Sequence, residues 1–298
     1  MDQVKKIKIQ DFVFYVTGMI VLIFSFSVLM ALIIDMFSTG WPRINQSFFF
    51  SFPSRFAEKA GIFSAWVGSI AVVVVTALMA IPLGVATGVY LEEYAKKNWV
   101  SQIIELNILN LAGIPSIIYG IMALSMFVYQ FKLGQSILTA GMTLGLLILP
   151  IIIVTTREAI RTIPSHIREA SYAVGATKWQ TIRYHILPYS SGGIMTGVVI
   201  ALSRAIGETA PLVTVGALTF IAFLPTSPIL EHSPYISLQW LLDPYTVMPI
   251  QMFNWISRPQ EEFHVNAAAA GMVLLSMTLT LNLGAILIRY YFRKKYKW

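Results

Sequence analysis

Cysteine is absent from the 298-residue sequence, which excludes disulfides, thiol catalysis and cysteine-ligated metal sites. The histidines are few and fall at no spacing typical of a zinc site: they are His166, His185, His232 and His264. Neither a G-x-x-x-x-G-K-[ST] motif nor a G-x-S-x-G motif occurs. The chain therefore has no P-loop for nucleotide phosphates and no signature of a serine hydrolase. We expect it to be no enzyme and to need neither a metal nor a cofactor.

Charged residues are also scarce. They make up 12% of the sequence and hydrophobic residues 56%, compared with about 25% and roughly 45–50% in ordinary soluble domains. A helix needs about 20 apolar residues to cross a bilayer core of roughly 30 Å. Six runs are long enough, and only the fifth contains charged residues: 12–34, 62–91, 106–131, 133–156, 192–224 and 266–288. The sequence therefore predicts an all-α polytopic membrane protein with six transmembrane helices.

Two of these runs contain residues that disturb helices. The second includes Pro82, Gly84 and Gly88, and the third includes Gly113 and Pro115, so we expect kinks or tilts there. The first run is longer than the roughly 7–15 apolar residues of a signal peptide, and no Ala-x-Ala cleavage site follows it. We therefore interpret the first run as a retained membrane anchor.

Lysine and arginine are distributed unevenly over the connections, which indicates the orientation of the spans. Fifteen lie before the first run, between the second and third, between the fourth and fifth, or after the sixth, whereas five lie in the other connections. This excess predicts that both termini and the loop 157–190 lie on the cytoplasmic side of the membrane. We expect that membrane to be the inner (cytoplasmic) cell membrane. Loops 35–61 and 225–265 are then external. We divide the chain into an N-terminal anchor with its external loop, 1–61, and a transmembrane domain, 62–298.

The connection between the fourth and fifth runs has the pattern of two short helices. Pro164 suits the first turn of one helix, and Gly175 can adopt the left-handed conformation that ends it. Thr177 can cap the second helix, and we expect Pro188 to mark its end or a boundary soon after. A basic hairpin that touches anionic lipid is the simplest interpretation of this segment.

A second interpretation rests on "EASYAVGATKWQTIRYHILP", residues 169–188. This segment resembles the EAA loop of ABC-transporter permeases, and five positions match in register: Glu169, Ala170, Gly175, Leu187 and Pro188. Ser171 replaces the second alanine, a small-for-small change, and His185 stands where an aliphatic residue is usual. The resemblance implies a type I importer permease of MetI-like architecture. It also implies that this loop docks into a groove of a separate ATP-hydrolysing subunit.

Three further segments narrow the resemblance: "SRAIGETAPL" (203–212), "FNWISRPQEEF" (253–263) and "AAAAGMVLL" (267–275). Together they resemble the PstA-type permease subunits of phosphate-specific importers, although the sister PstC type has a related Arg-Ala-Ile-Gly-Glu-Thr stretch. The resemblance implies a PstC-like second permease, a PstB-like ATPase and an external PstS-like phosphate-binding protein as partners, with membrane lipid around the spans and no nucleic acid.

Other functions remain open at this point. One is a permease for another oxyanion, such as sulfate or molybdate, and another is the PstC-type sister subunit. A third is an ion-gradient-driven carrier that works alone. The EAA-like loop argues against the third, because a lone carrier has no use for a docking element.

Arg204 and Glu208 interrupt the fifth apolar run. A charge at the bilayer centre costs about 2.5 kcal/mol or more, so intramembrane charges usually face protein or water and mark a pathway. Their spacing of four residues places them on one helix face, where they can pair. One interpretation is that the pair positions the helix. The other is that Arg204 binds a phosphate-like anion with its planar guanidinium, while Glu208 holds Arg204 in place and keeps the anion from being trapped there. We also expect Gly207 to admit a neighbouring backbone and Pro211 to break the helix.

Overall fold

The computed structural model describes residues 2–96, 98–229, 235 and 237–295. Within them every regular element is helical. In chain order the elements are α1 (Asp2–Gly40), η1 (Trp41–Arg43), α2 (Gln46–Phe50), η2 (Ala57–Lys59), α3 (Phe63–Val89), η3 (Tyr90–Tyr94), α4 (Trp99–Ala112), α5 (Ser116–Ala123), η4 (Leu124–Gln130), α6 (Ile137–Arg161), α7 (Ser165–Ala173), α8 (Lys178–Thr181), η5 (Ile182–Ile186), α9 (Leu187–Gly207), α10 (Ala210–Thr214), η6 (Gln239–Leu242), α11 (Met248–Ile256) and α12 (Glu261–Lys295). The elements η3, η4 and η5 are π-helical turns.

Five helices of the described chain are long and apolar enough to cross a membrane, and a bent pair of helices can form a sixth span. The bent pair lies in the run 106–131, where Gly113 and Pro115 predicted a kink or tilt, and that prediction is confirmed. α4 and the α5–η4 segment enclose an angle of 103°, because Pro115 has no N–H to donate and disfavours helical geometry at Ile114. The sequence indicated where the helix bends, but hydropathy is uniform across the break and did not indicate how large the bend is.

α6 is the central helix of the body, with α3 and α9 packed along it. Small residues bring the helices together. A Cβ atom on Gly84 would lie 2.6 Å from Ile152 Cγ2, and one on Gly88 would lie 2.7 Å from Thr156 Cβ. Gly197 of α9 meets α6 in the same close manner. Close approach through glycine gives van der Waals packing where no hydrophobic driving force acts between helices in lipid, so α3, α6 and α9 form one tightly packed unit.

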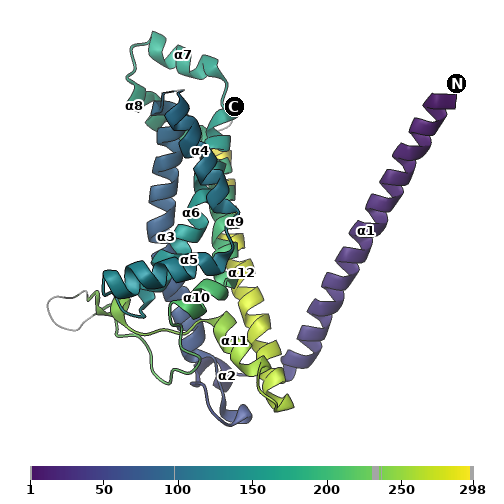
Figure 1. The fold of residues 1–298 in the computed structure, drawn as a ribbon, viewed down its shortest axis with the longest axis vertical. Helices are drawn as coiled ribbons and strands as arrows, with labels where there is room; N and C mark the ends of the chain where they lie inside the picture. Colours follow the sequence, from purple (N-terminus) through teal and green to yellow (C-terminus); the bar gives the residue numbers. More distant parts are fainter. Residues whose placement is uncertain (1, 97, 230–234, 236, 296–298) are drawn as a thin grey trace.

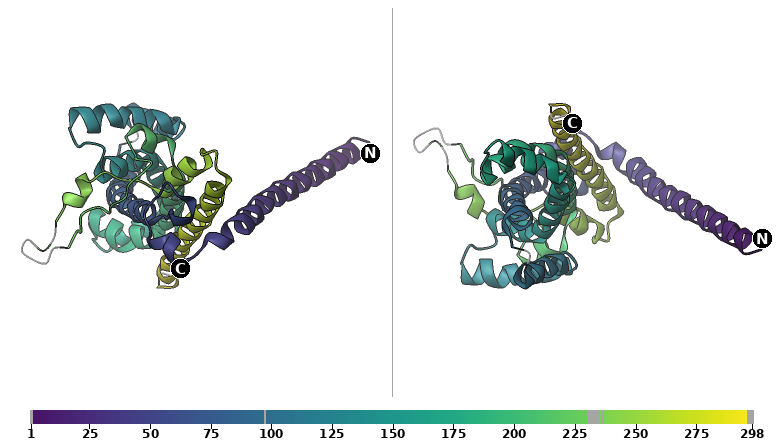
Figure 2. Two further views of the ribbon diagram at one scale, coloured as in Figure 1. Left: turned by 90° about the horizontal axis from the view of Figure 1, so that it is seen from below. Right: turned by 90° about the horizontal axis from the view of Figure 1, so that it is seen from above.

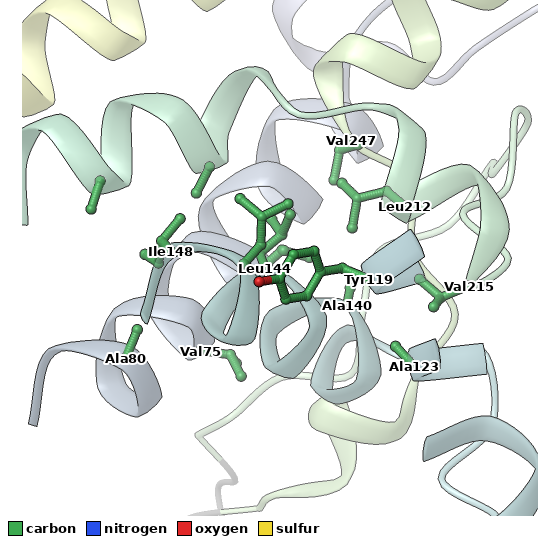
Figure 3. Close-up of a cluster of buried hydrophobic side chains, with 14 of the residues drawn as sticks. Val75, Ala80, Tyr119, Ala123, Ala140, Leu144, Ile148, Leu212, Val215 and Val247 are labelled. Carbon is green, nitrogen blue, oxygen red and sulfur yellow. The ribbon is translucent and has the colours of Figure 1, made fainter. Parts of the chain in front are cut away.

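The core of this unit is a layer of aliphatic side chains around α6. Leu144 and Ile148 of α6 are buried among residues of α3, α5, α9 and α10. Figure 3 shows Tyr119 of α5 beside Leu144, with Leu212 of α10 nearby. α3 also runs unbroken through Pro82. Pro82 and Pro115 each lie inside an apolar run but differ in their effect, because only Pro115 interrupts its helix.

α1 leaves the body and extends away from it, as Figures 1 and 2 show. Its apolar side chains are exposed along its length, and it is held at its C-terminal end. There a Cβ atom on Gly40 would lie 2.6 Å from the backbone nitrogen of Ala269 in α12. α1 therefore contacts the body through its last turns and presents its apolar length to the surroundings.

The body has two distinct ends. The end that carries α7 and α8 is here called the hairpin end, and the end that carries α2 and α11 is called the loop end (Figure 1). α1 begins and α12 ends toward the hairpin end. At the loop end, Arg43 donates hydrogen bonds to the carbonyls of Glu58 and Ala60 at 2.6 and 2.9 Å and to Asn266 Oδ1 at 2.8 Å. Arg43 thus ties the segment after α1 to the start of α12.

The segment expected as the loop 225–265 contains the short helix α11 and the 3₁₀ turn η6. Its prolines and turns agree with the expectation that no single long helix forms there. Residues 230–234 and 236, which include His232, lie outside the described residues, as do Lys97 and Lys297 of the charge count.

Candidate functional site

The segment between α6 and α9 folds into a helical hairpin made of α7 and α8, here called the EAA hairpin (residues 165–188). Gly175 follows α7 with a φ of +84°, as predicted. Thr177 caps α8 in a capping box: Gln180 N donates to Thr177 Oγ1 at 3.3 Å, and Thr177 N donates to Gln180 Oε1 at 2.8 Å. The reciprocal bonds satisfy backbone donors that the first helical turn leaves free. The local geometry predicted for the turn between the two helices of the hairpin is therefore confirmed.

A buried hydrogen bond closes the hairpin from inside. Thr181 Oγ1 donates to the carbonyl of Thr177 at 3.1 Å and therefore accepts from Ser171 Oγ, which lies 2.8 Å away. Ser171 and Thr181 are both almost fully buried. The serine in place of the second alanine of the EAA pattern is thus more than a small-for-small change, because its hydroxyl links α7 to α8.

Pro188 does not end the second helix of the connection, so that part of the prediction was wrong, but it lies close to the boundary between η5 and α9. The helix runs from Lys178 through η5 into α9 and ends at Gly207. Pro188 is the second residue of α9, one position beyond Leu187, which follows the π-helical turn η5. A π-helical turn shifts the hydrogen-bond register by one residue, and a proline that follows it is accommodated. Leu187 and Pro188 are half-buried where the hairpin joins the body.

The outer face of the EAA hairpin is exposed. Glu169 and Ala170 point outward on α7, and the side chains of Tyr172, Val174 and Trp179 are 43%, 85% and 55% exposed. The inner face buries Ile182 and Ile186 against the ends of α3 and α6. A compact knob with a rigid interior and exposed apolar, aromatic and acidic groups is suited to insertion into a groove of another protein.

Arg204 and Glu208 pair across one turn, as their spacing predicted. Arg204 Nε donates to Glu208 Oε1 at 3.3 Å. The predicted span over 192–224 is wrong in its extent, however, because α9 ends at Gly207 and Glu208 has extended geometry. The pair therefore lies at the C-terminal end of a span and not in the middle of one. The side chain of Arg204 is 42% exposed and that of Glu208 17% exposed.

Two expectations about the neighbours of this pair were also wrong. A Cβ atom on Gly207 would meet no other atom of the described chain within 4 Å, so this glycine does not mark a close approach of another segment of the chain. Pro211 does not break α9, which has already ended, but opens the short helix α10. α10 packs against α5, where the missing side chain of Gly120 makes room for Pro211 and Thr214.

Polar groups of α5 and α12 accompany the ion pair, and sequence reasoning missed them. Ser203, next to Arg204, donates its hydroxyl proton to Asn282 Oδ1 at 2.5 Å. Tyr119 of α5, which belongs to the same buried cluster as Ala205, donates its hydroxyl proton to the carbonyl of Leu111 at 2.8 Å. Asn282 lies within the apolar run 266–288. A polar amide in such a run was the one sign in the sequence that could have pointed to this polar cluster.

The fold of the body matches that of a known transporter chain. A chain of the methionine ABC transporter MetNI, in inward-facing conformations, superposes with a TM-score of 0.57 at 17% identity, and the match covers 76% of this chain and 93% of that one. The all-helical body therefore has the fold of that transporter chain.

Sequence similarity gives the family. Residues 80–298 match the model of the binding-protein-dependent transport system inner membrane component, and the chain belongs to this family. Phosphate transport system permease protein PstA 1 of Mycobacterium tuberculosis is 30% identical over 258 residues, which cover 84% of this chain and 79% of that protein. The probable ABC transporter permease protein YqgH of Bacillus subtilis is 38% identical over 244 residues, covering 80% and 74%. The chain is thus a transport subunit.

Proposed function

We propose that the chain is one of the two permease subunits of an ATP-driven importer of inorganic phosphate. The observation that carries the proposal is the EAA hairpin. A hydrogen bond between Ser171 and Thr181 closes its interior, and Glu169 and Ala170 are exposed on its outer face. Such an element serves a transporter that takes its energy from a separate ATPase. Phosphate as the substrate is supported by relatives named as phosphate transport permeases and by the segment 203–212 described above.

The partners follow from this role. A PstB-like ATPase binds the EAA hairpin on the cytoplasmic side, and a PstS-like binding protein delivers phosphate at the loop end. A PstC-like permease completes the pathway, because six spans are few for a closed one. α1 begins and α12 ends toward the hairpin end (Figure 1), which agrees with both termini lying in the cytoplasm.

Arg204 and Glu208 serve the substrate pathway in this proposal. Arg204 is partly exposed and paired through one bond of 3.3 Å, so its guanidinium retains donors for a phosphate oxygen. Glu208 competes for the same group and keeps anion binding weak enough for release. The alternative is that the pair only positions the end of α9.

Uptake measurements test the proposal. Cells that lack other phosphate importers and express the chain with its native partners should take up radiolabelled phosphate, and excess sulfate or molybdate should not compete. Competition by sulfate or molybdate would assign the chain to another oxyanion. Uptake that persists in liposomes without ATP would show an ion-gradient-driven carrier instead.

A further inference from the structure

The π-helical turn η3, at the hairpin end of α3, carries two glutamates and a tyrosine: Glu92, Glu93 and Tyr94. The turn lies far from the EAA hairpin in the sequence, since Glu93 and Arg168 are 75 positions apart. Nevertheless, it contacts α6, α7 and α8 at once. These contacts form two separate sets, one between η3 and α6 and one between η3 and the hairpin.

The first hairpin contact joins η3 to α7. Arg168 of α7 donates to Glu93 Oε1 from Nη2 at 2.7 Å and from Nε at 3.0 Å. The side chain of Glu93 is 7% exposed and that of Arg168 is 22% exposed. Two charge-assisted bonds to one buried carboxylate fix both distance and orientation, so this is not a loose surface ion pair.

Arg168 also binds the end of α6. Its Nη1 donates to the carbonyl of Ile163 at 3.0 Å, and its Nη2 approaches the carbonyl of Ile160 at 3.4 Å. Carbonyls in the last turn of a helix have no partner within the helix. One side chain therefore connects three elements: α7, the end of α6 and η3 at the end of α3.

The second hairpin contact joins η3 to α8. The ammonium group of Lys178 lies 4.8 Å from the ring centroid of Tyr94, within the range of a cation–π interaction. Both helices of the hairpin thus hold the same turn. Beneath them Val89 of α3 packs in one apolar cluster with Ile160, Ile182 and Ile186.

Chain connectivity gives these contacts their significance. The hairpin is joined covalently to α6 and α9, whereas α3 continues into α4 and has no covalent link to it. α3 packs along α6 through Gly84 and Gly88, so a displacement at η3 is passed along a closely packed helix. Because no covalent link joins α3 to the hairpin, movement of the hairpin can reach α3 only through noncovalent contacts.

We propose that η3 is the receiving element of the EAA hairpin, and that the Arg168–Glu93 pair is the joint that transmits movement of the hairpin to α3. This rests on the proposed role of the hairpin as the element that a separate ATPase moves. Arg168 and Glu93 are positioning residues, since they contact neither phosphate nor nucleotide. Their loss uncouples ATP hydrolysis from transport and leaves the outer face of the hairpin unchanged.

The experiment measures coupling in the complete importer. The chain, its permease partner, the ATPase and the binding protein are reconstituted in liposomes, and phosphate uptake and ATP hydrolysis are measured together. In Arg168→Met and in Glu93→Gln, phosphate carried per ATP should fall roughly three- to tenfold while ATP hydrolysis continues. Should Arg168→Met fail to assemble, Glu93→Gln carries the test, because Arg168 then keeps its backbone partners.

Glu92→Gln is the matched control. Glu92 lies in the same turn but binds Arg157 and Arg161 of α6 at 3.4 and 3.0 Å. Its removal orphans neither arginine, since Glu105 lies 2.9 Å from Arg157 and Glu158 lies 3.1 Å from Arg161. The ratio of phosphate to ATP should stay at the wild-type value.

A covalent rescue separates transmission from simple loss of stability. The chain has no cysteine, so Glu93→Cys with Arg168→Cys introduces the sole pair of thiols in this subunit. The unlinked double variant should be uncoupled, and a short bis-maleimide bridge should restore the ratio. Two results would refute the proposal that the Arg168–Glu93 pair transmits movement to α3. One is unchanged coupling in Glu93→Gln, and the other is an equal loss of phosphate uptake and ATP hydrolysis that the bridge does not restore. A wild-type complex that carries no phosphate would instead overturn the proposed function.

Discussion

Ser171 Oγ and Thr181 Oγ1 lie 2.8 Å apart in the buried interior of the EAA hairpin and join its two helices. The bond explains how nine residues of α7 and four of α8 hold one shape. Helices this short are marginal by themselves, so contacts between them and with the body must fix their arrangement.

Ser171→Ala should weaken the hairpin without disrupting it. Thr181 keeps its bond to the carbonyl of Thr177, so no buried donor is orphaned and the cost should be about 1 kcal/mol. Thermal unfolding of the purified importer and ATPase stimulation by the binding protein are the measurements. Ser165→Ala, at an exposed position of α7, is the control and should behave as wild type. A full loss of assembly in Ser171→Ala would contradict this account.

Gly175→Val should impair transport through backbone strain alone. The φ of +84° is costly for a β-branched residue, at about 1–2 kcal/mol, whereas no atom of the described chain lies within 4 Å of a Cβ there. Gly175→Asn should retain most activity, because asparagine tolerates this conformation. Phosphate uptake and insertion of the spans are measured side by side. Full uptake and ATPase stimulation in Gly175→Val would indicate a hairpin that only touches lipid.

Gly88→Leu should destabilise the α3–α6 contact. The side chain would collide with Thr156, and forcing extra volume into a packed site costs about 1–3 kcal/mol. Gly284→Leu in α12 is the matched control, since a Cβ there meets no atom of the described chain within 4 Å. Thermal unfolding in detergent compares the two, and equal stability of both variants would refute close packing at Gly88.

Variants at Arg204 and Glu208 distinguish the pathway role from the positioning role. Arg204→Met with Glu208→Met removes both charges and leaves neither unpaired, and replacing a paired set of charges by apolar residues is often neutral for folding. If the pair serves the substrate, this variant should assemble and couple to the ATPase but carry little phosphate.

Arg204→Lys keeps the charge without the planar fork, so it should also be impaired. Glu208→Gln leaves Arg204 unpaired and should slow release of the anion or destabilise the end of α9. Uptake is measured with co-purification as the check on assembly. Near-normal uptake in the double Met variant would leave Arg204 and Glu208 as a helix-positioning pair.

Cysteine labelling tests the orientation. Ser165 on the EAA hairpin and Ser227 in the loop-end segment are both exposed, and the chain has no cysteine of its own. Single cysteines at the two sites should react with an impermeant reagent from opposite sides of the membrane. Reaction of the cysteine at position 165 in intact cells would reverse the predicted topology.

Local features of the fold were readable from the sequence because neighbouring residues produce them. The apolar runs identified the spans, the caps at Gly175 and Thr177 follow from residues within one turn, and the Arg204–Glu208 pair follows from helical spacing. The end of α9 at Gly207 was missed, and at Pro115 the sequence predicted a kink but not the size of the bend. There the apolar pattern continues although the helix does not.

The sequence by itself therefore determined that this chain enters a membrane, where its hairpin lies and which charges share a helix face. These properties depend on transfer to lipid and on hydrogen bonds between near neighbours. The tertiary structure alone decided that α5 turns by 103° from α4, that Gly88 faces Thr156, and that Arg168 holds Glu93. The last two pairs lie tens of residues apart in the sequence, and only the packing of α3, α6 and the hairpin into one body brings them into contact.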